Sequence, residues 1–410
     1  MKRAFLLPAF VAAAFIAAVV PTAFAQEEDS APTIHVYTKT IPLAAAGAAH
    51  TGKSFKASPA VAGSGSAIPM WNYSLTSSTD SHSYSGTMVG SSPYFNGART
   101  TNIPTVIVPI VVVLSDGSVY DPTANDKCAG NNSAVNLVTG SPIFQPYDFT
   151  INGINMGSGQ YIDEFQRANF YDNGPNVAET GNSYHTILTN ANGAPGATVL
   201  SPVTINMPAN LGESWNRYTC SPIAVIDYAT FTSDVTNNLL PSLASEGFGA
   251  STFVVFLVHD VVMAEPGDSL NSNCCVVGLH GALQANSGAP VQTYAIADYD
   301  TSGVIGQTGI ETLSQEVGDW MDNPLGTNLT PSWGDTGDVS TCVNYLSVSD
   351  PIFGWPFSPS GVTMPNGVTY NPQQLAFFSW FYGISPSLGA GGGYSDGITL
   401  SVPAHLCDES

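Results

Sequence analysis

Basic side chains are scarce in this chain. Lysine and arginine number 9 among 410 residues, against 31 acidic residues, and charged residues make up only 10% of the sequence. The net charge of −22 repels nucleic acids and anionic membrane surfaces, so we expect no nucleic-acid partner. With so few charges, the surface must be covered mainly by uncharged polar residues, as suits an extracellular protein.

Several motifs that mark common enzyme classes are missing. No Gly-x-Gly-x-x-Gly or Walker-type loop follows an expected strand, so a nucleotide site is not implied. The sequence has no Gly-x-Ser-x-Gly elbow, which argues against a serine hydrolase. It also has no Cys-x-x-Cys spacing, so disulfides are favoured over a cysteine-rich zinc site.

Long apolar runs are absent after the first segment. Lys2 and Arg3 precede an apolar stretch over residues 4–20, which ends in Ala-Phe-Ala at 23–25, the pattern of a secretory signal peptide. Cleavage there removes two of the nine basic residues and leaves a net charge of −24. No later stretch is long enough to cross a bilayer, so we expect a secreted or periplasmic protein without a membrane span after residues 1–25 are removed.

Six cysteines in an exported chain predict up to three disulfide bonds. They lie at positions 128, 220, 274, 275, 342 and 407. Sequence alone does not choose among the possible pairings. We expect the adjacent Cys274 and Cys275 to bond to different partners, because a bridge between neighbours closes a strained ring.

The chain divides into a leader and one large domain. Residues 26–69 are rich in Ala, Gly, Ser and Pro and are interpreted as a flexible leader, followed by a single globular domain over 70–410. Strands are expected at 105–114, 223–231, 253–263, 275–279, 292–296 and 398–402. Helices are expected at 161–171, 234–246, 307–321 and 373–382. The last helix is rich in aromatic residues, which indicates a buried face or, alternatively, a platform that stacks on carbohydrate.

The helix expected at 307–321 carries a segment with metal-site spacing. Gln315 and Asp319 lie one turn apart on the same helix face, and Glu316 lies beside them. In zinc peptidases, His-Glu-x-x-His uses this spacing to hold the metal with its first and last side chains. The glutamate between them deprotonates a metal-bound water.

With its surroundings, this segment resembles secreted proteins that carry a zincin-like His-Glu-x-x-Glu helix, including the plant phosphate-induced (EXORDIUM-like) family and related bacterial secreted proteins. The matching residues are Ser314 to Asp319, Asp322-Asn323-Pro324, Trp333, Gly337-Asp338 before Cys342, and the glycine run 391–393 before Tyr394. The resemblance implies a zincin-like α+β fold with its site-bearing part at about 220–410. In that fold a mixed twisted sheet packs against the active-site helix, and the aromatic-rich helix lies behind.

The resemblance also implies a metal site, which departs from the family pattern. Gln315 replaces the first histidine and Asp319 the closing glutamate, while Glu316 matches the general base. Asp338 matches a downstream carboxylate, with Asp335 as a second candidate. Gln315, Asp319 and Asp338 offer only oxygen ligands, which suit Ca²⁺ or Mg²⁺ better than Zn²⁺.

Three functions follow from this pattern. The first is an exported metallopeptidase-like protein, degenerate in catalysis, that binds a peptide or a cell-wall glycan. The second is an active metal-dependent endopeptidase with Glu316 as general base and a divalent metal, Zn²⁺ or Ca²⁺, as cofactor. The third is a structural protein that interacts at the cell surface.

Two other patterns carry ligand-type side chains. Asp298-x-Asp300-x-Ser302-Gly303 copies the opening of an EF-hand loop, but Gly309 holds the place of the closing glutamate, which favours a simple turn. His259-Asp260 follows a strand, and His280 lies between two glycines. Either histidine is a candidate metal ligand or general base, although a hydrogen-bonded structural histidine is the commoner case.

Overall fold

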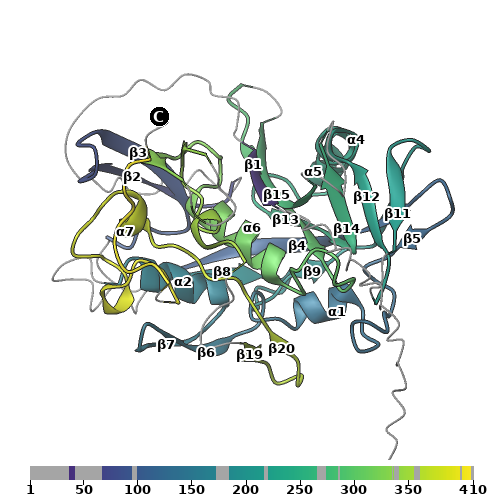
Figure 1. The fold of residues 1–410 in the computed structure, drawn as a ribbon, viewed down its shortest axis with the longest axis horizontal. Coiled ribbons are helices and arrows are strands. Elements are labelled where there is room, and N and C mark those ends of the chain that lie inside the picture. Colours follow the sequence, from purple (N-terminus) through teal and green to yellow (C-terminus); the bar gives the residue numbers. More distant parts are fainter. Residues whose placement is uncertain are drawn as a thin grey trace, which may run out of the picture. The chain divides into compact units, whose positions relative to one another are not determined.

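A curled mixed sheet of 12 strands is the centre of the protein (Figure 1). The computed structural model describes residues 37–41, 67–94, 99–171, 184–216, 220–265, 274–284, 287–334, 336, 341–354, 361–397 and 399–407. Residues 34–410 form one compact unit. The expected signal peptide at 1–25 lies outside the described residues.

Most of the described strands belong to this sheet. Its members are β1 (Tyr37–Ile41), β4 (Arg99–Val113), β5 (Val119–Tyr120), β8 (Tyr184–Thr189), β9 (Thr198–Val199), β10 (Val203–Asn206), β11 (Gly212–Trp215), β12 (Ile223–Asp227), β13 (Phe253–His259), β14 (Val261–Ala264), β15 (Val276–Gln284) and β16 (Val291–Tyr299). The main path runs β10-β4-β13-β16-β15-β14-β12-β11. In its middle, β4, β13 and β16 are parallel, and β15 runs antiparallel to β16.

Small hairpins and short helices surround the sheet. The hairpins are β2 (Met70–Thr76) with β3 (Ser83–Val89), β6 (Tyr147–Ile151) with β7 (Ile154–Gly159), β17 (Leu329–Trp333) with β18 (Val343–Tyr345), and β19 (Val362–Thr363) with β20 (Thr369–Tyr370). The helices are α1 (Ala134–Thr139), α2 (Tyr161–Asn169), α4 (Tyr228–Asp234), α5 (Leu240–Ser245), α6 (Glu311–Asp322) and α7 (Phe378–Phe381). A π-helical segment, Val235–Leu239, joins α4 to α5, and short 3₁₀ turns lie at Asp350–Ile352 and Ala390–Gly392.

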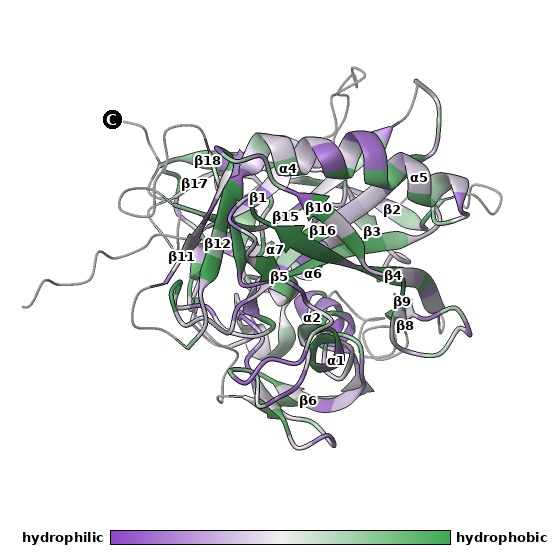
Figure 2. Ribbon diagram, turned by 90° about the vertical axis from the view of Figure 1, so that its right-hand side faces the viewer, coloured by the Kyte–Doolittle hydropathy of each residue, from purple (hydrophilic) through white to green (hydrophobic). Residues whose placement is uncertain are grey.

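The strand β13 shows how the sheet forms the core. All seven of its residues are buried, and alternate side chains enter two different apolar clusters. Phe253, Val255 and Leu257 join the cluster that contains α6, whereas the alternate residues join the one that contains α4 and α5. Figure 2 shows α4 and α5, which carry both hydrophilic and hydrophobic residues, above the apolar strands. A strand covered on both faces explains the unbroken apolar run in the sequence.

The helix α6 packs directly on the sheet. Trp320 stacks on Phe253 with ring centroids 3.7 Å apart, and its indole N–H donates to Thr293 Oγ1 on β16 over 2.9 Å. Gly278 on β15 permits close approach, because a Cβ there would lie 2.6 Å from Thr312 and 2.7 Å from Glu316. The helix is therefore seated on β15 and β16.

The expected zincin-like α+β fold is wrong. Strands hold 38% of the residues and helices 18%, and the centre is a large curled mixed sheet rather than a sheet packed with long helices. Many strands were missed because their segments are polar or rich in glycine, as in β3 and β7. In the expected helix at 373–382 only Phe378–Phe381 is helical, and 399–402 contains no strand.

Other expected elements are confirmed. Of the strand expected at 105–114, all residues but Leu114 lie in β4, and α2 and α6 appear within a few residues of their expected bounds. The expected strand at 253–263 divides into β13 and β14 at Asp260, whose φ of +53° lies in the left-handed region. Such a φ is uncommon for a residue with a side chain, and here it turns the chain between the two strands.

Three cysteine pairs lie at disulfide distance: Cys128–Cys220, Cys342–Cys407 and Cys274–Cys275. The expectation that Cys274 and Cys275 bond to different partners is wrong, because the other four cysteines pair among themselves. Among the described residues, no helix is long and apolar enough to cross a membrane. The cysteine pairs are compatible with a secreted protein.

Candidate functional site

The polar residues predicted as a site lie inside the protein. Every residue of α6 after Glu311 is buried; Gln315 and Glu316 have no exposed surface, and Asp319 is 2% exposed. An ordinary amphipathic surface helix would leave such polar side chains in solvent. Each polar side chain must therefore find its hydrogen bonds within the protein.

Gln315 bonds to a neighbouring loop. Its Nε2 donates to Gln373 Oε1 over 2.5 Å, and Gln373 donates from its own Nε2 to the Ser349 carbonyl over 2.9 Å. The remaining atom, Gln315 Oε1, is buried without a hydrogen-bond partner. An amide oxygen is a weak ligand for zinc, so this position does not replace the imidazole of a zinc peptidase.

Asp319 is saturated by protein donors. Its Oδ2 accepts from the Ser349 hydroxyl over 2.5 Å and from the Ser347 hydroxyl over 3.1 Å, and its Oδ1 accepts from the Ser349 N–H over 3.1 Å. Burial, and then the nearby Asp350 carboxyl, raise the pKa of Asp319. The segment from Ser347 to Asp350 therefore occupies the side of Asp319 from which a metal would be held.

The Glu316 side chain extends from α6 toward β15. Its Oε2 is 3.3 Å from His280 Nδ1, and His280 Nε2 is 3.3 Å from the Asn323 carbonyl oxygen. Burial lowers the pKa of His280 to about 4, so the ring is neutral near pH 7. A neutral ring that donates from Nε2 to Asn323 accepts at Nδ1, so Glu316 must supply the proton between them. Glu316 is thus buried and hydrogen-bonded within the protein.

Only part of the predicted metal-ligand set lies among the described residues. The structure brings Gln315 and Asp319 to the same side of α6, as their spacing predicts, but each bonds to a different protein group. Asp338 and Asp335 lie outside the described residues. Trp380 is 5% exposed, and the other aromatic residues from Phe377 to Tyr382 are at most 1% exposed, so this segment does not provide a carbohydrate-stacking platform.

A strand from the expected leader covers the edge of β15 beside α6. Over Gly278–Gly281, β15 pairs with β16 on one edge and with β1 on the other. In Figure 1, β1 lies against β15 near α6. The β1 pairing is parallel, from Tyr37 opposite Val276 to Ile41 opposite Gly281. The leader therefore contributes an outer strand next to the helix that carries Glu316.

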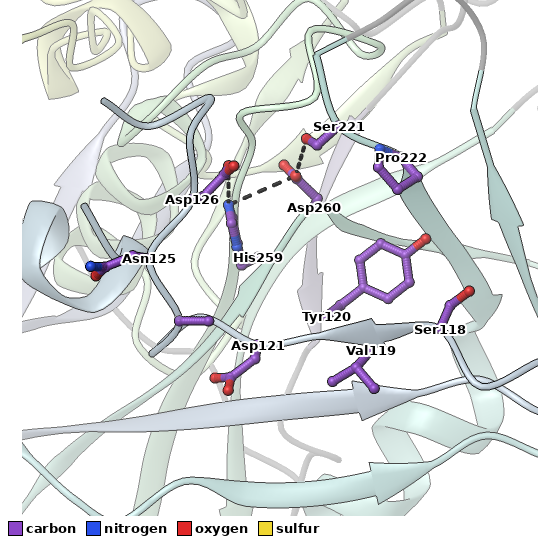
Figure 3. Close-up of a pocket in the computed structure, with 11 residues that line it drawn as sticks. Ser118, Val119, Tyr120, Asp121, Asn125, Asp126, Ser221, Pro222, His259 and Asp260 are labelled. Atoms are coloured by element: carbon purple, nitrogen blue, oxygen red, sulfur yellow. Dashed lines mark hydrogen bonds and ion pairs between the residues drawn. The ribbon is translucent and has the colours of Figure 1, made fainter. Parts of the chain in front are cut away.

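A second polar cluster lies at the carboxyl ends of the parallel strands β13 and β16 (Figure 3). His259 ends β13, and its Nε2 lies 3.4 Å from Asp126 Oδ2 and 3.7 Å from Asp260 Oδ2. These residues line a cavity of about 540 Å³ together with Tyr120 and Ser221. Ligand sites occur commonly at the carboxyl ends of parallel strands.

The segment with the EF-hand-like pattern, residues 298–303, contacts the same cluster. Thr301 and Ser302 both donate their backbone N–H groups to Asp260 Oδ1, over 2.6 and 3.0 Å. Asp298 and Asp300 flank this turn, and burial raises the pKa of both, with a further rise from Asp260. Two patterns that are separate in the sequence thus form one acidic site.

Two groups of described residues hold their ligand atoms close enough for a metal ion: Asp126 with His259 and Asp260, and Asp163 with Glu164 and His185. The sequence pointed to His259 and Asp260 but not to Asp126, Ser221 or Thr301. One signal was present: Cys128 and Cys220, which are paired, lie close in sequence to Asp126 and Ser221. The sequence does not determine that these two cysteines pair, so it could not bring Asp126 and Ser221 together.

Comparison of the chain with protein-family models, with curated proteins and with solved structures finds no match.

Proposed function

We propose that this chain is an exported metallopeptidase-like binding protein, without hydrolytic activity at Glu316, that holds an extended peptide along the edge of β15. The observation that carries the proposal is the pairing of Tyr37–Ile41 with Val276–Gly281. A strand edge presents unpaired N–H and C=O groups that an extended peptide satisfies by adding a strand. In the free chain, β1 occupies this edge.

The contacts of β1 indicate what the edge accepts. The Tyr37 N–H donates to the Cys275 carbonyl over 2.9 Å, a contact that any peptide backbone can make. The Thr38 hydroxyl donates to Asp350 Oδ1 over 3.3 Å, and Lys39 forms an ion pair with Glu265. The edge therefore suits an extended peptide with a small hydroxyl residue followed by a basic residue.

Charge and packing favour the same ligand class. The Lys39 ammonium also lies 5.0 Å from the centre of the Tyr228 ring, within range of a cation–π contact. A chain with 31 acidic and only 9 basic residues attracts a basic peptide over a distance. The resemblance of residues 314–324 to zincin-like helices remains a prediction and points to the same class of ligand.

A peptide-binding assay tests the proposal on the full mature chain. A variant carrying Lys39→Pro and Thr40→Pro cannot keep β1 paired. Proline lacks the backbone N–H, and two consecutive prolines remove an N–H from each edge of the strand. We expect a labelled peptide of residues 36–42 to bind this variant at least tenfold more tightly than the native chain. A second variant, Lys39→Glu, loosens β1 through repulsion from Glu265 without altering the backbone.

The matched control is the same peptide with proline in place of Lys39, which we expect not to bind either chain. Equal binding of the unmodified peptide to native and variant chains, or binding to neither, contradicts the proposal. A second measurement is casein hydrolysis by the native chain, and we expect no hydrolysis. Hydrolysis that is lost in Glu316→Gln establishes the active endopeptidase instead.

A further inference from the structure

We propose that Asp126, His259 and Asp260 form a Zn²⁺ site at the mouth of the cavity in Figure 3. This site lies apart from α6 and does not depend on the peptide-binding proposal. The bound ion leaves a coordination position open toward the cavity, where a water molecule or an anionic ligand group completes the shell.

The ligand geometry fits zinc. Zn²⁺ bonds imidazole nitrogen and carboxylate oxygen at roughly 2.0–2.2 Å, so neighbouring ligands of a tetrahedral ion stand about 3.3 Å apart. His259 Nε2 lies 3.4 Å from Asp126 Oδ2 and 3.7 Å from Asp260 Oδ2, and all three ligand atoms lie within 4.8 Å of one another. The Thr301 hydroxyl contacts all three of these atoms, so it must turn away or join the ligand shell when an ion binds.

The fold holds these ligands in place before any ion binds. Asp260 takes its left-handed φ at the end of β13, which turns its carboxylate toward the N–H groups of Thr301 and Ser302. The Cys128 N–H donates to Asp126 Oδ1 over 2.9 Å, and the Cys128–Cys220 disulfide fixes that loop. One carboxylate oxygen of each aspartate is used in this way, and Oδ2 of each faces His259.

The cluster has more acceptors than donors. The Thr301 hydroxyl lies 2.6 Å from Asp126 Oδ2, 3.0 Å from His259 Nε2 and 3.1 Å from Asp260 Oδ2, but it has one hydrogen to donate. In the tautomer that carries its proton on Nδ1, His259 Nε2 is a metal ligand. The Ser221 hydroxyl also donates to Asp260 Oδ2, so two hydroxyl hydrogens serve three acceptor atoms in this tautomer, an arrangement that a cation can complete.

A separate observation beside the cluster is a buried acidic side chain with an unpartnered oxygen. Asp298 is 1% exposed, and its Oδ2 has no hydrogen-bond partner, while its Oδ1 accepts from the Val261 N–H over 3.0 Å. It lies within electrostatic range of Asp260 and Asp300. This third buried acidic side chain adds to the acidic groups gathered at the ends of β13 and β16.

The second candidate group already contains its own cation. Arg167 forms an ion pair with Glu164 over 2.5 Å, and Asp163 Oδ2 lies 2.6 Å from His185 Nδ1. The guanidinium offsets the charge of Glu164, although Glu164 Oε1 has no hydrogen-bond partner, and Asp163 is bonded to His185. His185 consequently serves as a matched control for His259.

The choice of zinc follows from the donor set. Ca²⁺ and Mg²⁺ prefer six or more oxygen ligands, and this site offers one nitrogen and two carboxylate oxygens. A site with three protein ligands and an open position is a common arrangement for zinc.

The test is calorimetric titration of the full mature chain with Zn²⁺ after chelator treatment. We expect one Zn²⁺ per chain, and at least tenfold weaker binding in Asp126→Asn and in His259→Gln. The matched control His185→Gln keeps native affinity. Substitution with Co²⁺ gives the visible absorption of a low-coordinate ion, which disappears in His259→Gln and confirms that the histidine is a ligand.

Several results overturn the proposal. They are the absence of Zn²⁺ binding to the native chain, retention of full affinity in both Asp126→Asn and His259→Gln, and loss of affinity in His185→Gln alone. Tighter binding of Ca²⁺ than of Zn²⁺ also overturns it. Circular dichroism of each variant establishes that it is folded before titration.

Discussion

Glu316 Oε2 lies 3.3 Å from Nδ1 of His280, and neither side chain has any exposed surface. Because His280 donates from Nε2 to the Asn323 carbonyl, one proton must lie between Glu316 and Nδ1. The pair links α6 to β15 by a hydrogen bond.

This pair predicts a contrast between two substitutions. Glu316→Gln keeps a donor toward Nδ1, so its stability should stay within about 1 kcal/mol of native. Glu316→Ala leaves a buried ring nitrogen without its partner and opens a cavity, and should cost about 2–4 kcal/mol. Urea unfolding of both variants measures the difference. Equal losses in the two variants would contradict the shared proton.

Close packing of α6 on β15 predicts that Gly278→Ala is destabilising. The new Cβ would lie 2.6 Å from Thr312 Cγ2 and 2.7 Å from Glu316 Oε1. Overpacking of this kind should cost about 1–3 kcal/mol. The matched control is Gly249→Ala, whose nearest neighbour lies at 3.7 Å, and we expect a change within about 0.5 kcal/mol. Thermal unfolding of the two variants checks both values.

Buried carboxyl groups predict that stability decreases with rising pH. Burial raises the pKa of Asp322 and of Asp396 to about 7, from an ordinary value of 3.8. The folded chain therefore holds protons that the unfolded chain releases. The stabilisation is complete below about pH 4 and is lost as pH rises through 7, by about 1 kcal/mol per pH unit for each group. Unfolding measured from pH 4 to pH 8 tests this.

Asp396 supplies the control for that prediction. The Tyr161 hydroxyl contacts both Asp396 Oδ2 and the Gln373 carbonyl, but it has one hydrogen to donate. A protonated Asp396 donates to Tyr161, which then donates to Gln373. Asp396→Asn reproduces that donor without a titrating group, so it should fold and show a shallower pH dependence. An unchanged slope contradicts the assignment of the proton.

The disulfide beside the cavity should affect both stability and zinc binding. Cys128 and Cys220 enclose 92 residues of chain, so removing their bond by Cys128→Ser with Cys220→Ser should cost about 3–5 kcal/mol. It also releases the Asp126 loop and should weaken Zn²⁺ binding. Cys342→Ser with Cys407→Ser is the control: it lowers stability but leaves Zn²⁺ affinity unchanged. Calorimetric scanning and Zn²⁺ titration of both pairs separate the two effects.

The sequence predicted the parts of the fold that local patterns determine. The apolar runs in β4 and β13 identify fully buried strands, and the apolar spacing of Leu313, Val317 and Trp320 identifies α6. Strands such as β3 carry few apolar residues, because pairing and tertiary contacts rather than alternation hold them. The α+β expectation failed for that reason.

The candidate site was predicted only in part. Helical spacing correctly placed Gln315 and Asp319 on one face of α6, but it cannot reveal that Ser349 and Gln373 cover that face. The ends of β13 and β16 placed His259 and the Asp298 pattern, whereas their approach to Asp126 depends on strand order and disulfide pairing. Both are long-range properties that one sequence does not display.

The complete burial of α6 has a consequence for how this segment changes over evolutionary time. A helix enclosed on all sides tolerates few substitutions, because packing and hydrogen bonding constrain nearly every position. Selection for folding alone is then enough to preserve Gln315, Glu316 and Asp319, whatever chemistry they perform. The identity of these three residues is therefore explained by a requirement for folding and is not by itself a measure of catalysis.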